Sequence, residues 1–124
     1  MLIPEKLMQV LGHEGVVAIV TMGKDGPHVV NTWNSYVHVT KDGHFLIPVG
    51  GMHQTEANIG MSPRILMTLG ARGVEGFRGP GTGFLVEGTA SFVRSGDVFD
   101  EVKQKFPWIR AVLTVAVSTA TQTL

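Results

Sequence analysis

The stretch Val49–Asn58 has the composition of an anion-binding turn. Two glycines, Gly50 and Gly51, end an apolar run and precede a segment that favours a helix. Glycine permits a sharp turn and a close approach of a ligand, while the free N–H groups and positive dipole end of a helix suit a phosphate. Gln54 and Thr55 add side-chain donors. Because the P-loop spacing is absent, a plain strand-to-helix turn is an equally good interpretation.

The stretch Asn31–Tyr36 places small polar residues and two aromatic ones inside an otherwise apolar strand. Buried polar side chains need hydrogen-bond partners, so this many in one strand indicate a ligand. A solvated edge strand with aromatic packing is the alternative. A strand alternates its side chains between two faces. One predicted face therefore carries Asn31, Trp33 and Ser35, and the other carries Thr32, Asn34 and Tyr36.

Other kinds of chemistry have weaker support in the sequence. Trp108 either belongs to the core or walls a flat aromatic ligand, and both interpretations stay open. None of the five histidines has metal-ligand spacing, and only His53, beside the glycine turn, is singled out. The chain has no cysteine, and no nucleophile–base arrangement can be placed. We therefore predict no metal site and no catalytic residues.

Composition limits the classes of function that remain. The 124 residues predict one domain, and ten basic residues balance ten acidic ones, which argues against a nucleic-acid partner. No apolar run is long enough to span a membrane, and Pro4, Glu5 and Lys6 argue against a secretory signal, so a cytoplasmic protein is expected. Hydrophobic content of 44% with only 16% charged residues indicates apolar surface that a partner or a ligand covers.

The elements that would position these residues are mostly strands. Helices are predicted at 4–11, 53–59 and 98–105, and a glycine-rich loop at 70–83. Gly88, inside a long strand, predicts a bulge or a barrel corner. Meander-connected strands favour a small closed or half-closed β-barrel. The predicted strands are 16–21, 28–36, 44–49, 64–69, 83–93 and 109–118.

Seven longer motifs are distributed over essentially the whole chain: Glu14–Ile19, Asp25–His28, Val30–Tyr36, Pro48–His53, Thr55–Asn58, Gly79–Phe84 and Gln122–Leu124. Together they resemble the small FMN-binding proteins of sulfate-reducing bacteria. These proteins belong to the split-barrel flavoproteins and are similar to pyridoxamine-phosphate oxidases and flavin reductases.

The resemblance implies a mainly β, single-domain protein (1–124): a six-stranded split β-barrel with two or three short helices. It also implies a homodimer that binds FMN noncovalently near the interface, with the C-terminal leucine crossing to the flavin of the other protomer. The phosphate would meet Asn31, Thr32, Ser35 and Thr55, and the flavin ring would meet Trp33, Tyr36 and Trp108. The remaining cofactor-binding residues that the resemblance implies are Val49, Gly50, Gly51, Met52, Gln54 and Leu124.

One position departs from the family pattern. A relative of this kind has lysine before the threonine of the phosphate turn, whereas this chain has Gln54. Glutamine offers only neutral donors in place of a full positive charge, which predicts weaker FMN binding. An electron-transfer protein is the favoured function, because short loops leave little chain for a substrate pocket. A flavin reductase or a pyridoxamine-phosphate-oxidase-like oxidoreductase is the alternative, and a non-flavin use of the barrel is a third.

Overall fold

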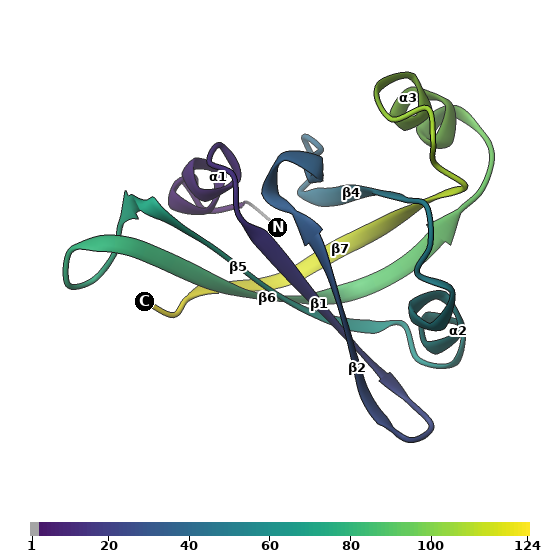
Figure 1. The fold of residues 1–124 in the computed structure, drawn as a ribbon, viewed down its shortest axis with the longest axis horizontal. Coiled ribbons are helices and arrows are strands. Elements are labelled where there is room, and N and C mark those ends of the chain that lie inside the picture. The colour runs from purple at the N-terminus through teal and green to yellow at the C-terminus, as the bar shows by residue number, and fades with distance from the viewer. Residues whose placement is uncertain (1–2) are drawn as a thin grey trace.

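The computed structural model describes residues 3–124, and strands dominate it (Figure 1). The predicted helices are present, each within two residues of its expected bounds. The helices are α1 (Glu5–Leu11), α2 (His53–Met61) and α3 (Asp97–Lys105), with the 3-10 turn η1 (Asn34–Tyr36). The strands are β1 (Val16–Gly23), β2 (Gly26–Trp33), β3 (His38–Val39), β4 (His44–Val49), β5 (Arg64–Glu75), β6 (Pro80–Val93) and β7 (Ala111–Gln122).

The strands form one antiparallel sheet in the order β2-β1-β5-β6-β7-β4-β3. Six of them are long, and β3 has only two residues. The edge strands β2 and β3 do not pair with each other within the described chain, so the barrel stays open. The predicted six-stranded split barrel is confirmed. Figure 1 shows α2 and α3 at one end of the molecule and the C-terminus at the opposite end.

The core lies on the inner face of the curved sheet. Alternate residues of the strands point inward, as period-two patterning requires, and α1 covers them with Leu7 and Val10, which are fully buried. A smaller cluster under α3 joins Leu46, Val102, Ile109 and Val112. No helix within residues 3–124 is both long enough and apolar enough to cross a bilayer.

The predicted loop at 70–83 is wrong, because most of it is a hairpin. β5 continues to Glu75 and β6 begins at Pro80. The glycines that suggested a loop are needed because the strands approach closely: a Cβ on Gly70 would lie 2.8 Å from the Thr82 carbonyl oxygen. Gly79 and Gly81 have positive φ values of 134° and 104°, which side-chain-bearing residues rarely adopt.

The strand predicted to run through Tyr36 ends at Trp33. Asn34 leaves the strand and is fully buried, with its Nδ2 donating to the carbonyls of Val10, His13 and Gly70 at 3.3, 2.9 and 3.1 Å. The side-chain amide thus ties η1 to α1 and β5, and this tertiary requirement overrides strand propensity. The prediction of two alternating faces is therefore wrong beyond Trp33.

The last strand also differs from its predicted bounds. β7 begins at Ala111 rather than at residue 109 and continues to Gln122, where it pairs with Phe84 of β6. The predicted end at residue 118 is therefore wrong, because the backbone of residues 119–122 is paired with β6. The predicted irregularity at Gly88 is confirmed, since the β6–β7 register shifts between Glu87 and Gly88.

Candidate functional site

The turn before α2 presents free N–H groups. Met52 has φ 59° and ψ 37°, the left-handed region, and is followed directly by the helix. The first backbone bond of the helix runs from Glu56 N–H to the Met52 carbonyl at 2.9 Å. Within residues 3–124 no acceptor bonds the N–H groups of Met52, His53, Gln54 or Thr55. A left-handed residue beside right-handed ones aims successive N–H groups into one concavity, which suits an anion.

Thr55 gives this turn a second, independent sign of a ligand. Its side chain is fully buried in the first turn of α2, and no partner in the described chain bonds its hydroxyl oxygen. An unpaired buried hydroxyl costs free energy. A phosphate oxygen is the kind of acceptor that the Thr55 hydroxyl and the neighbouring N–H groups would share, so these residues fit a phosphorylated ligand.

Gln54 is oriented along the helix and not across its N-terminus. Its Nε2 donates to Asn58 Oδ1 at 2.9 Å, and Asn58 Nδ2 donates to the Thr21 hydroxyl at 3.1 Å. This chain of hydrogen bonds fixes α2 against β1. The Gln54 amide nitrogen is therefore already bonded within α2.

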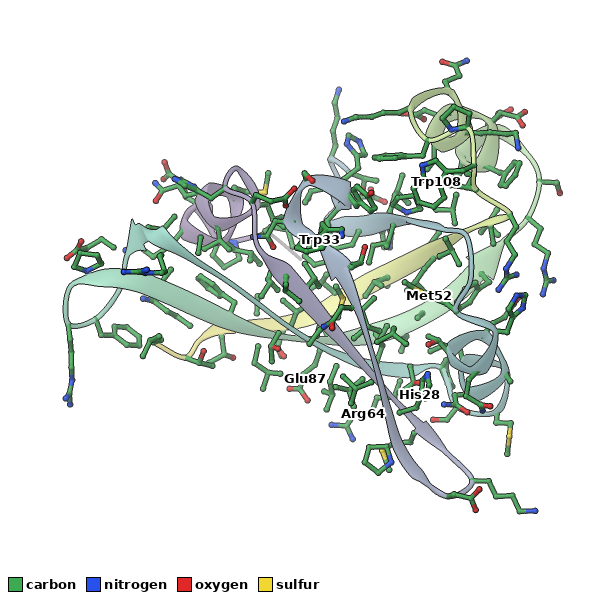
Figure 2. The ribbon with its side chains drawn as sticks, in the orientation of Figure 1. His28, Trp33, Met52, Arg64, Glu87 and Trp108 are labelled. Atoms are coloured by element: carbon green, nitrogen blue, oxygen red, sulfur yellow. The ribbon has the colours of Figure 1, made fainter. Side chains whose placement is uncertain are left out.

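Aromatic residues form a wall beside the turn. Tyr36 lies 5.1 Å from Phe106 and 5.8 Å from Trp108 between ring centroids. Trp108 in turn packs on Gly50, where a Cβ would come within 3.2 Å of the indole. The indole is half exposed, so one side stays free for a flat ligand. Figure 2 shows Trp33 at the end of β2, Met52 in the turn before α2 and Trp108 in the connection to β7.

The β2 residues divide between the two faces of the sheet. Asn31 and Trp33 are exposed on the outer face, and Thr32 is buried on the inner one. Val49 lies wholly in the core, and its carbonyl accepts the Arg110 N–H at 2.9 Å, so only its backbone can adjoin a ligand.

Ser35 contacts a carboxylate within the chain. Its hydroxyl donates to Glu14 Oε2 at 2.7 Å, and its N–H donates to Glu14 Oε1 at 3.2 Å. These hydrogen bonds, with a further one from the Gly15 N–H, lower the pKa of Glu14 below its ordinary value, the Ser35 hydroxyl contributing most. Glu14 thus carries a negative charge beside the strand end that holds Trp33.

Leu124 lies far from Trp108 in its own chain. β7 separates it from Trp108, and twelve strand residues span roughly 35–40 Å. Its backbone is held at the β5–β6 hairpin, where the Thr82 hydroxyl donates to the Leu124 carbonyl at 2.7 Å. The leucine side chain itself is 65% exposed.

Sequence reasoning missed the group that supports the turn. Arg110 Nε donates to the Gly51 carbonyl at 3.1 Å, and its Nη1 donates to Glu56 Oε1 at 2.8 Å. Arg94 pairs with the other oxygen of Glu56. Arg110 is 59 residues from Gly51, and only the β4–β7 pairing brings them together, so no local pattern could have revealed the contact.

The fold and this site together define a split β-barrel with a turn of free N–H groups beside an aromatic wall. The chain belongs to the pyridoxamine 5'-phosphate oxidase family, whose model matches residues 3–122. A curated relative, the FMN-binding protein of Nitratidesulfovibrio vulgaris (strain Miyazaki F), is 52% identical over 123 residues, which are 99% of this chain and 100% of the relative. The resemblance that the sequence motifs indicated is confirmed.

Solved structures with low sequence identity support the fold alone. HupZ of Group A Streptococcus aligns with a TM-score of 0.80 at 17% identity, over 98% of this chain and 94% of that one. A crystal structure of an FMN-binding protein from Syntrophomonas wolfei aligns with a TM-score of 0.74 at 14% identity, over 97% of this chain and 85% of that one.

Proposed function

We propose that this protein binds FMN noncovalently and serves as a small electron-transfer protein. The observation that carries the proposal is the turn at Met52–Thr55, with its free N–H groups and its buried, unpartnered Thr55 hydroxyl. The half-exposed Trp108 packs on Gly50, two residues before Met52, and offers a surface for a flat ring. The FMN-binding relative at 52% identity supports the same ligand.

Each part of the site has a definable role. The N–H groups of 52–55 and the Thr55 hydroxyl would hold the phosphate, and the exposed Asn31 lies on the strand that leads toward the ring. Trp33, Tyr36 and Trp108 would orient the ring and exclude water from its faces. FMN, when bound, supplies the redox chemistry, and the protein sets its orientation and electrostatic surroundings.

The outer face of the sheet supports a homodimer as part of this proposal. Val16, Met22 and Val29 are 48, 55 and 57% exposed, and the β1–β2 register places them on the same face as Trp33. Apolar surface of this extent typically marks an interface. A groove on this face extends to Thr123, next to the C-terminus. A twofold dimer across the face would bring one protomer's Leu124 toward its partner's ring.

The proposal is tested by purifying the protein and adding FMN to the apoprotein. We expect flavin absorption to co-purify with the protein and flavin fluorescence to be quenched on titration. We also expect reversible reduction of the bound flavin without fast NAD(P)H oxidation. An apoprotein that takes up no FMN at micromolar concentrations would refute the proposal.

A flavin-dependent oxidoreductase is the second candidate, and one observation favours it. A cavity of about 440 Å³ opens between α3 and the β3–β4 hairpin, where Tyr36, Leu46 and Phe106 line it beside Glu101 and Lys105. Because Tyr36 belongs to the aromatic wall, this space could hold a substrate near the ring. Catalytic turnover of NAD(P)H or of a phosphorylated amine by the holoprotein would select this candidate.

We expect the bound flavin to have a reduction potential below that of free FMN. The stretches assigned to the flavin contain no Lys or Arg, and the charge of Arg110 is matched by Glu56 at 2.8 Å. The lowered pKa of Glu14 keeps this carboxylate charged down to pH values below its ordinary titration range. Added negative charge on the ring is then disfavoured, and Glu14→Gln should raise the potential. A redox titration of both proteins measures this, and a wild-type potential above free FMN would contradict it.

We expect Gln54→Lys to tighten FMN binding by about 1 kcal/mol or more, because charge-assisted hydrogen bonds are stronger than neutral ones. The lysine would gain a contact that the Gln54 amide, bonded to Asn58, does not supply. Fluorescence titration at two salt concentrations measures the affinity, and the variant should lose more of it at high salt. Equal affinities would show that side chains at position 54 point away from the phosphate.

A further inference from the structure

We propose that Arg110 is a positioning residue for the phosphate end of the ligand, a role that rests on the proposed function. Its guanidinium clamps the Gly51 carbonyl and so orients the N–H groups of the following turn. Arg110 is thereby a determinant of the preference for a phosphorylated flavin over its unphosphorylated form, although it lies outside every stretch that the sequence assigns to the ligand.

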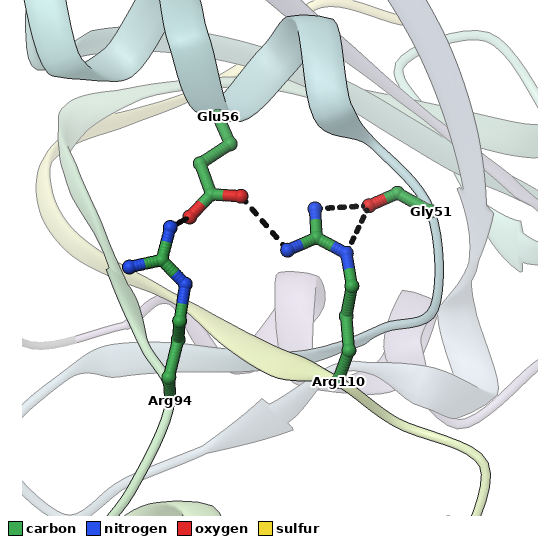
Figure 3. Close-up of polar contacts among 4 residues, drawn as sticks. All are labelled: Gly51, Glu56, Arg94 and Arg110. Atoms are coloured by element: carbon green, nitrogen blue, oxygen red, sulfur yellow. Dashed lines mark hydrogen bonds and ion pairs between the residues drawn. The ribbon is translucent and has the colours of Figure 1, made fainter.

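Two nitrogens of Arg110 converge on one oxygen. Nε donates to the Gly51 carbonyl at 3.1 Å and Nη2 donates to the same oxygen at 2.5 Å (Figure 3). The backbone of Arg110 is fixed as well, since its N–H donates to the Val49 carbonyl at 2.9 Å. The guanidinium is planar and presents its donors in a rigid fork, which a lysine ammonium cannot reproduce.

This clamp fixes the direction of the next N–H group. In a trans peptide the carbonyl and the N–H point in opposite directions, and the chain has no cis peptide within residues 3–124. Because the Gly51 carbonyl faces Arg110, the Met52 N–H points to the opposite side. Met52 is the only non-glycine residue with positive φ among residues 3–124. A left-handed methionine is an unfavourable conformation that the surrounding contacts must maintain.

Glu56 holds the guanidinium in place. It accepts Nη1 of Arg110 at 2.8 Å and pairs through its other oxygen with Arg94 (Figure 3). The Arg110 and Glu56 side chains are 27 and 17% exposed, whereas Arg94 is 66% exposed. Two arginines against one carboxylate leave one positive charge, which the exposed Arg94 carries. The inner pair is therefore the fixed part of the network, and Arg94 is its solvent-facing end.

The test compares FMN with riboflavin, because a merely structural role would change both affinities alike. For Arg110→Lys we expect an FMN dissociation constant raised about tenfold or more, with that of riboflavin changed less than about threefold. Arg94→Gln is the matched control, since it removes a guanidinium from the same carboxylate but none from Gly51. Arg94→Gln should leave both dissociation constants within about threefold of the wild-type values.

Glu56→Gln keeps the side-chain shape and provides a second test that does not depend on the folding of an Arg110 variant. If Glu56 positions Arg110, FMN binding weakens, while if it acts by charge alone, the loss of a negative charge tightens FMN binding. The positioning role would be overturned if Arg110→Lys lost equal affinity for FMN and for riboflavin. Tighter FMN binding in Glu56→Gln would overturn it as well. A wild-type protein that binds FMN and riboflavin equally would also overturn it, whereas one that binds neither refutes the proposed function itself.

Discussion

Replacing Gly88 with alanine should lower the free energy of unfolding of the apoprotein by about 3 kcal/mol, because the added methyl group overpacks the sheet. Gly88 is buried in β6 at the shift in register with β7. A Cβ there would lie 2.3 Å from the Ala116 carbonyl oxygen and 3.1 Å from a Val115 methyl carbon. The oxygen belongs to the backbone of the neighbouring strand, so only a shift of β6 or β7 can make room.

The measurement is urea unfolding at one fixed protomer concentration, because a dimer's stability depends on concentration. Gly60→Ala is the matched control. Gly60 lies inside α2, and a Cβ there meets nothing within 4 Å. Alanine at this position should stabilise the protein by roughly 0.5–1 kcal/mol, since it restricts the unfolded chain and favours the helix. Equal stability of Gly88→Ala and wild type would show that the register shift does not depend on glycine.

The bulge at Gly88 illustrates what the sequence could predict. A glycine inside a strand otherwise rich in apolar and β-branched residues has few explanations, and a bulge is one of them. The same local reasoning placed β4, whose predicted and observed bounds agree, and all three helices. These elements carry their own signals in periodicity, proline and glycine. A mainly β, barrel-like fold therefore followed from patterns confined to short windows of sequence, whereas the six-stranded split barrel followed from the resemblance.

The errors occurred where distant contacts decide the local structure. The glycines of 70–83 suggested a loop because their strands approach too closely for side chains, a fact that only the paired strand explains. Asn34 ended β2 early because three carbonyls from other elements bond its amide. Strand propensity is easily overridden by tertiary contacts of this kind.

The candidate site was predictable only in part, for the same reason. The turn at Gly50–Met52 and the aromatic residues were visible as composition. The clamp from Arg110 was not, because a cation before an apolar strand has no distinctive pattern, and its partner Gly51 lies in another element. The separation of Leu124 from Trp108 was also invisible, since it depends on the length and direction of β7.

Substituting Leu124→Ala should weaken both FMN binding and dimerisation. The leucine side chain is 65% exposed while its carbonyl is anchored by the Thr82 hydroxyl, so the backbone presents an apolar group to solvent in a fixed place. In the proposed dimer this group covers the partner's flavin. Burying one leucine side chain is worth about 1.5–3 kcal/mol, part of which the alanine variant would lose. Met61→Ala is the matched control, because Met61 is 75% exposed at the end of α2, far from the C-terminus.

Sedimentation of apo and holo forms, together with FMN titration, would measure both effects. If the two protomers share each site, FMN binds the dimer better than the monomer, and adding FMN should shift the wild-type protein toward dimer by mass action. Leu124→Ala should reduce that shift, and Met61→Ala should leave it unchanged. Covering the ring also excludes water and strengthens local electrostatic interactions, so the flavin potential should change in Leu124→Ala and stay constant in Met61→Ala. A holoprotein that remains monomeric at micromolar concentration, or an Leu124→Ala variant with unaltered FMN affinity, would rule out a shared site.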